Sequence, residues 1–271
     1  MVKQSAYPRR IAYGETRLGG IWFYANTTGG KNEYLHLVLG ICEGPIESVD
    51  TIFFGDDAIA IDANGDATTE KYQDHFRAKV HLGDQTTADA DLIAEDANWT
   101  SNHKLLGIAY VYCRFKHSAE VFDGGLPEVS FKITGANDIE DPRTRVIGYT
   151  NLTAACWGHY LRTSRVGPNI ARENIDIDYQ SDATVICDQD VDLKAGGTEK
   201  RYTLDGAFLT DTDPEEIISS MVESMAGWQV FTGGLFRPYA GAFTEPVFSV
   251  TSDMVIDAVE IQYRKPRSQR A

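Results

Sequence analysis

The segment Lys200–Gly241, KRYTLDGAFLTDTDPEEIISSMVESMAGWQVFTGGLFRPYAG, predicts a strand, a capped helix and a hairpin in succession. Asp213 is placed to cap the helix, Pro214 suits its first position, and Glu216 stands where a capping box has its carboxylate. We expect Gly227 to end the helix, because glycine adopts positive φ without strain. The order of these signals makes this the best-defined unit of the chain.

The helix within this segment has one apolar face, and a hairpin signal follows it. The apolar residues recur at helical spacing and are Ile217, Met221 and Met225, with Ile218 and Val222 beside them. Beyond the helix, residues 228–231 and 235–239 flank Thr232-Gly233-Gly234, which predicts a hairpin turn. Nothing in this unit carries chemistry, so it points to a structural role.

The composition predicts a globular chain with its own core. The 271 residues suit one large domain or two ordinary ones, and 42% of them are hydrophobic. No apolar run approaches the roughly 18 residues of a membrane helix. The start, MVKQSAYPRR, does not look like a secretory signal. We therefore expect a soluble protein made in the cytoplasm.

The net charge and the cysteines further restrict the functions expected of this chain. The formal net charge of −15 opposes tight binding to nucleic acid, although an acidic channel would let DNA slide past without sticking. The small basic group near the C-terminus is interpreted as a solvated end or a contact with an acidic partner. The four cysteines are far apart in the sequence and form no CxxC pair, so we expect buried, reduced thiols: Cys42, Cys113, Cys156 and Cys187.

Strand signals dominate residues 8–135, which predicts a mostly antiparallel β domain over residues 1–135. A short helix is expected within residues 86–99. The stretch LLGIAYVYCRF at 105–115 is apolar on both faces, so we expect it to be a central strand. The other strands are expected at 21–24, 34–41, 46–54, 78–82 and 129–133.

A polar linker at 135–145 precedes a part of the chain with helical signals. Helices are expected at 152–161 and over Tyr179–Cys187, the second capped by Asp178. A final strand is expected at 258–263. Residues 136–271 are therefore predicted to form a second, mixed α+β domain with the strand–helix–hairpin unit. The fold class is α+β and β-rich.

The search for chemistry assigns no catalytic, cofactor-binding or metal-binding residue. The six histidines form no HxxxH or HExxH pattern, and His36 and His81 are expected to be ordinary strand residues. The chain has no GxSxG elbow and no phosphate-binding loop, so its glycine pairs are interpreted as turns. A pair of glycosidase carboxylates would need two marked acidic residues, and none is marked. The chain is therefore predicted not to be an enzyme and to hold no cofactor.

Two local patterns leave alternatives open. Asp62-Ala63-Asn64-Gly65-Asp66 spaces oxygen ligands as a calcium loop does. Ala67 and Gln73 stand where such a loop has its glycine and its glutamate, which favours an acidic Asn-Gly turn. Separately, the successive aromatics of residues 22–24 predict either a core on both faces of their strand or a subunit contact.

Several segments, in order along almost the whole chain, resemble the tip attachment proteins of phage tails. These are the J-type central tail hubs of long, non-contractile-tailed phages and prophages. The segments are Pro8–Gly20 (PRRIAYGETRLGG), Asn32–Leu37, Gly107–Val111, Val121–Pro127 (VFDGGLP), Asp141–Thr144 (DPRT), Tyr160–Gly167, Cys187-Asp188 and Arg201–Gly206 (RYTLDG). The chain departs from the family at Asn151-Leu152-Thr153, where members have Asn-Pro-Ala, so this helix is expected to begin later.

The resemblance implies a structural hub that closes the distal end of the tail tube. It implies a homotrimer in the virion tail tip, assembled in the bacterial host cytoplasm beside distal tail proteins and the tape measure protein. It also implies a role in host attachment and DNA delivery, with no specific nucleic-acid binding and with a host cell-surface receptor as a further partner. Should Ala271 be the natural end, receptor recognition is expected in another protein.

Two other functions remain as alternatives. The first is a receptor- or carbohydrate-binding β module, which predicts an exposed aromatic platform. The second is a cell-wall glycosidase, which predicts two close carboxylates in a cleft, one with a raised pKa.

Overall fold

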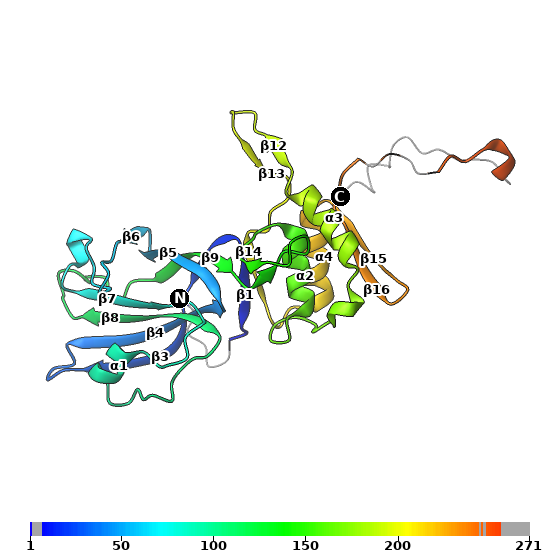
Figure 1. The fold of residues 1–271 in the computed structure, drawn as a ribbon. Helices are drawn as coiled ribbons and strands as arrows, with labels where there is room; N and C mark the ends of the chain where they lie inside the picture. The colour runs from blue at the N-terminus through cyan, green and yellow to red at the C-terminus, as the bar shows by residue number, and fades with distance from the viewer. Residues whose placement is uncertain (2–6, 244, 246–247, 256–271) are drawn as a thin grey trace, which may run out of the picture. The chain divides into compact units, whose positions relative to one another are not determined.

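The structure, a computed structural model, describes residues 1, 7–243, 245 and 248–255 (Figure 1). It divides into two compact units, Met1–Gly241 and Ala242–Ala271. The first unit is β-rich with antiparallel sheets and helices, which confirms the predicted α+β class. The described part of the second unit holds one short 3-10 turn, η3 (Ser252–Met254). Among the described residues, no helix has the length and apolar character needed to cross a bilayer.

Two four-stranded antiparallel sheets make up the N-terminal part of the first unit, and both contribute side chains to one core. The first sheet has the order β3-β4-β8-β7 and the second β2-β9-β5-β6. Their strands are β3 (Ile21–Thr28), β4 (Tyr34–Glu43), β8 (Ile108–Lys116) and β7 (Phe76–His81), then β2 (Glu15–Gly19), β9 (Val129–Ala136), β5 (Ile46–Phe54) and β6 (Asp57–Ile59). A 3-10 turn, η1 (Glu70–Tyr72), precedes β7.

Strands β4 and β8 are buried on both faces, as expected for the central strands of a sheet. Leu39 and Val111 point into the core shared by the two sheets. Val38 and Tyr112 lie in a smaller core on the opposite face, beneath α1 (Ala90–Glu95). The predicted central strand is thus confirmed, although it begins at Ile108. The helix expected within 86–99 is limited to α1.

A β-bulge accommodates the three successive aromatics in β3. Trp22 pairs with Leu39 and Tyr24 pairs with Val38, so Phe23 is the extra residue. The bulge turns Trp22 toward the shared core and Tyr24 toward the core beneath α1. The interpretation of a two-sided core is therefore confirmed for Trp22 and Tyr24.

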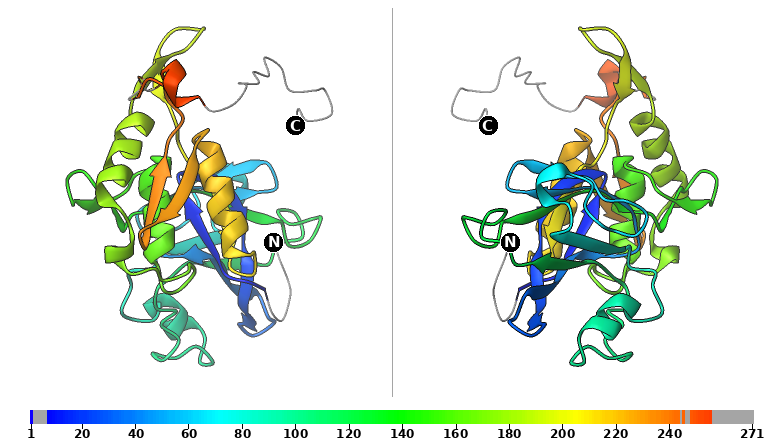
Figure 2. Two further views of the ribbon diagram at one scale, coloured as in Figure 1. Left: turned by 90° about the vertical axis from the view of Figure 1, so that its right-hand side faces the viewer. Right: turned by 90° about the vertical axis from the view of Figure 1, so that its left-hand side faces the viewer.

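The C-terminal part of the first unit packs three helices and a hairpin around a separate core. The helices are α2 (Thr153–Arg162), α3 (Ile177–Cys187) and α4 (Pro214–Ser224), and the hairpin is β15 (Trp228–Thr232) with β16 (Leu235–Tyr239). The remaining elements are short: β10 (Ile139–Glu140), β11 (Ile147–Gly148), η2 (Arg172–Asn174), β12 (Asp190–Asp192) and β13 (Thr198–Lys200). Figure 2 shows the β12–β13 hairpin extending away from the helices.

One strand belongs to both parts of this unit. β1 (Arg10–Tyr13) pairs with β14 (Gly206–Leu209), almost 200 residues later in the chain. Because strand side chains alternate, Ile11 and Tyr13 enter the helical core while Ala12 enters the core of the sheets. The division near residue 135 stays a prediction.

The segment 200–241 folds largely as its sequence predicts. Asp213 caps α4, but its carboxylate accepts a hydrogen bond from Glu215 N at 2.9 Å, not from Glu216 N as a capping box requires. Thr232 pairs with Leu235 across the expected hairpin turn. The expectation of a capping box is therefore wrong, and that of a capped helix with a hairpin is confirmed.

Two further expectations need correction, and a third concerns residues that the structure does not describe. Asp176, and not Asp178, caps α3, because the helix begins two residues earlier than its apolar spacing indicates. The positive φ at the end of α4 belongs to Ala226, at 49°, and not to Gly227. The strand expected at 258–263 lies outside the described residues.

Candidate functional site

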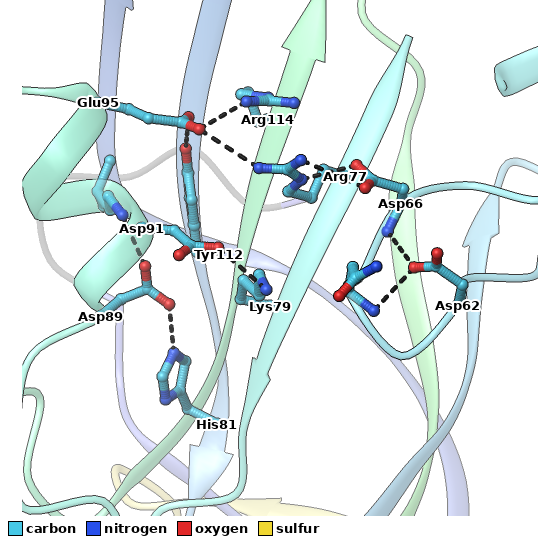
Figure 3. A network of polar contacts seen from close by, with 12 residues as sticks. Asp62, Asp66, Arg77, Lys79, His81, Asp89, Asp91, Glu95, Tyr112 and Arg114 are labelled. Carbon is cyan, nitrogen blue, oxygen red and sulfur yellow. Dashed lines mark hydrogen bonds and ion pairs between the residues drawn. The ribbon is translucent and has the colours of Figure 1, made fainter. Parts of the chain in front are cut away.

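A row of ion pairs attaches α1 to the first sheet (Figure 3). Alternate residues of β7 face the helix, and each meets a carboxylate of α1 or of its cap. Lys79 Nζ lies 3.0 Å from Asp91, and His81 Nε2 lies 2.7 Å from Asp89, which also caps the helix. A helix of six residues is not stable alone, so these pairs and the small core beneath it hold it in place.

Glu95 is the most connected residue of this network (Figure 3). Its carboxylate lies 2.6 Å from Arg114 Nη1 and 3.4 Å from Arg77 Nη1, and it accepts a hydrogen bond from Tyr112 Oη at 2.9 Å. Tyr112 Oη in turn lies 2.7 Å from Nδ1 of the buried His36. Burial lowers the pKa of His36, so this histidine is neutral near pH 7. The chain of contacts is internal and satisfied, which fits a structural role.

A polar cleft of about 530 Å³ opens beside this network, at the end of the sheet where β4 begins and β8 ends. The Asp62–Asp66 turn forms one side of it. Asp62 Oδ1 accepts hydrogen bonds from the backbone N–H groups of Asn64 and Asp66, both at 2.9 Å. These bonds, and φ of 85° at Gly65, are those of the predicted Asn-Gly turn.

The second carboxylate of this turn, that of Asp66, forms an ion pair with Arg77. Both oxygens of Asp66 bind Arg77, at 2.7 and 3.2 Å, and these hydrogen bonds lower the pKa of Asp66. No group of three or more His, Cys, Asp and Glu side chains that could hold a metal ion occurs among the described residues. The acidic-turn interpretation is thus favoured over a calcium loop.

The histidines, the cysteines and Phe23 have structural positions in the fold. His36 and His81 lie in strands, as predicted. The four cysteines are buried and free, and burial raises the pKa of the Cys42 thiol to about 12. Phe23 is 41% exposed, but its ring lies over Gly40 of its own sheet.

No sequence pattern indicates a Tyr–His–Asp chain that runs from the buried Tyr13 to the exposed Asp138, between the two parts of the first unit. Tyr13 Oη lies 2.9 Å from His159 Nδ1, and His159 Nε2 lies 3.1 Å from Asp138. Burial alone would raise the pKa of Asp138, but the hydrogen bond and the charge of His159 outweigh it and lower this pKa. Residues 146 apart in the chain leave no local pattern by which to find them.

Six of the eight segments quoted above contact one another in three pairs. In the first pair, β1 pairs with β14, and Asp205 accepts a hydrogen bond from Glu15 N at 2.9 Å. Gly14 is required there, because a Cβ atom would overlap Asp205. In the second, Arg143 Nη1 lies 2.7 Å from Asp188.

The third pair joins the β-rich part to the end of α2. Arg165 Nη2 donates to Gly107 O at 2.8 Å, which links the 107–111 and 160–167 segments. The residues that make these hydrogen bonds and this ion pair all lie within the quoted segments. These segments therefore specify how parts of the first unit pack together.

The outer strand of the β15–β16 hairpin exposes large apolar side chains. Trp228 is 56% exposed and stacks on Tyr239 with ring centroids 5.3 Å apart, and Phe231 is 64% exposed. On its outer edge, β15 has no neighbouring strand in the described residues. An apolar strand with an unpaired edge is a surface to which another chain can add.

Comparisons with known proteins give a structural likeness but no family. No family model matches the chain, and no curated protein matches it. A chain in a structure described as "Virion of native gene transfer agent (GTA) particle" is similar at 17% sequence identity, with a TM-score of 0.49. The match covers 90% of this chain and 55% of that one, so this chain spans about half of its length.

Proposed function

We propose that this chain is a structural protein of a phage or prophage tail tip, acting as the central hub that closes the distal end of the tail tube. Its main support is that segments resembling J-type hubs run in order along the chain, and that six of the eight lie against one another in the fold. The hub role would include tail assembly, host attachment and DNA delivery.

In this proposal the chain is not an enzyme and works through its surfaces. Three copies would form a closed ring through heterologous contacts, in which one surface of each copy meets a different surface of the next. The exposed face of the β15–β16 hairpin is our candidate for one of the two surfaces. The other partners would be distal tail proteins and the tape measure protein. The net charge of −15 would let DNA pass without specific binding.

The trimer can be tested by light scattering on the purified chain. We expect a species of three times the 30.0 kDa chain mass at high protein concentration. Replacing the exposed Trp228 with serine should shift the species toward monomer, because it removes an aromatic anchor from the interface. The matched control is Leu106→Ser, since Leu106 is 58% exposed and lies away from the hairpin.

Two results would argue against the ring. One is a chain that stays monomeric at high concentration, also when co-expressed with the neighbouring tail proteins. The other is a trimer that Trp228→Ser leaves intact, which would place the interface away from the hairpin.

A further inference from the structure

The polar cleft at the end of the first sheet has a balanced set of charges. Side chains from β7, β8 and two turns surround its volume of about 530 Å³. Three carboxylates and three cations line it: Asp62, Asp66, Asp74, Arg77, Arg114 and Lys116. A strongly anionic ligand would be repelled by the carboxylates, and a strongly cationic one by the arginines and the lysine. The balance favours a ligand without large net charge.

Much of the cleft wall is fixed before any ligand arrives. Arg77 is held by both oxygens of Asp66 and by Glu95, and Arg114 is held by Glu95 at 2.6 Å. Side chains that are already ordered lose little entropy on binding. The wall therefore presents donors and acceptors in set positions.

Other groups at the cleft are left to bind a ligand. Gln73 and Lys116 expose their side chains there. The aromatic ring of Tyr34 lies at the same end of the sheet, with the Arg114 guanidinium 5.4 Å from its centre. Free polar side chains beside an aromatic ring are typical of a binding site.

We propose that this cleft binds a hydroxyl-rich saccharide unit. Each hydroxyl can both donate and accept a hydrogen bond, so neighbouring hydroxyls match a wall that holds both carboxylates and cations. One face of a sugar ring carries C–H groups, for which the Tyr34 ring offers a partner. The volume lies within the range of about 300–1,000 Å³ usual for ligand sites. The inference goes beyond the assembly role and stands on the cleft alone.

An array of printed bacterial surface oligosaccharides tests the proposal with the full chain. We expect selective binding to one or a few of them. For a bound oligosaccharide, calorimetry on Gln73→Ala and Lys116→Ala should show affinity reduced about tenfold in each variant. Both side chains lie outside the ion-pair network, so these variants should fold normally. Lys104→Ala, the same change at an exposed lysine away from the cleft, should bind as the unchanged chain does.

Two outcomes would overturn the saccharide site. One is the absence of selective binding across the array by a folded chain. The other is binding that neither cleft variant weakens, which would place the sugar elsewhere. The mass measured by light scattering reports separately on the ring, so the failure of one proposal is distinguishable from the failure of the other.

Discussion

At the scale of single residues, a glycine can be required at the end of a helix for two reasons: a positive φ, or a lack of space for a Cβ atom. At the end of α4 these two requirements fall on different residues. The helix ends with hydrogen bonds from Ala226 N to Glu223 O and from Gly227 N to Val222 O. In this arrangement the residue with positive φ is Ala226. Gly227 is required for space, because a Cβ atom there would overlap the carbonyl oxygen of Tyr239 in β16.

We therefore predict that Gly227→Ala lowers the free energy of unfolding by about 3 kcal/mol, since the backbone of β16 must move to admit the methyl group. Ala226→Gly should change it by less than about 1 kcal/mol. The relief of positive φ and the added freedom of the unfolded chain nearly cancel in that variant. Urea unfolding of both variants measures the difference. Equal losses would contradict this account of the turn.

At the scale of elements, ion pairs join short strands and turns to the helices. Glu140 in β10 lies 2.7 Å from Arg162 at the end of α2 and 2.6 Å from Arg172 in η2. Burial alone would raise the pKa of Glu140, but the hydrogen bonds from the two arginines outweigh it, so this pKa is lowered from 4.5. The folded state thus prefers the ionised carboxylate.

A lowered pKa in the folded state sets the direction of the pH dependence. The stabilisation by Glu140 is fully present above pH 4.5 and is lost as pH falls through the lower pKa of the folded state. We predict that Glu140→Gln costs about 1–2 kcal/mol at pH 7 and that its stability then falls less steeply between pH 5 and pH 3 than that of the unchanged chain.

Urea unfolding at a series of pH values checks this prediction. The matched control is Glu173→Gln, the same change at an exposed glutamate within η2. The control should follow the pH profile of the unchanged chain. If Glu140→Gln also followed it, the ion pairs would not contribute as described.

The elements that the sequence predicted best are those with local signals. The cap at Asp213, the apolar spacing of α4 and the Gly-Gly turn act within a few residues, so segment 200–241 was largely predictable. The cap of α3 is not predicted correctly because Asp176 and Asp178 both stand near its start, and the local sequence does not select between them. The network around Glu95 joins β4, β7, β8 and α1, and no spacing along the chain indicates it.

At the scale of the molecule, segments far apart in the chain meet in the first unit. Strand β1 contributes to both cores of the first unit and pairs with β14, so its short sequence is constrained on both faces. This constraint gives a physical reason why the amino-acid sequence of segment 8–20 would be restricted in a hub. The cleft is not predicted as a site, because its lining comes from four separate stretches of chain.

Gold-labelled antibodies against this chain, applied to particles released by the bacterium that encodes it, test the central claim most directly. Electron microscopy of the labelled particles gives the position of the chain. The proposed function predicts gold at the end of the tail farthest from the head. Gold on the head or along the tail shaft, or particles that carry no gold, would contradict a hub at the tail tip.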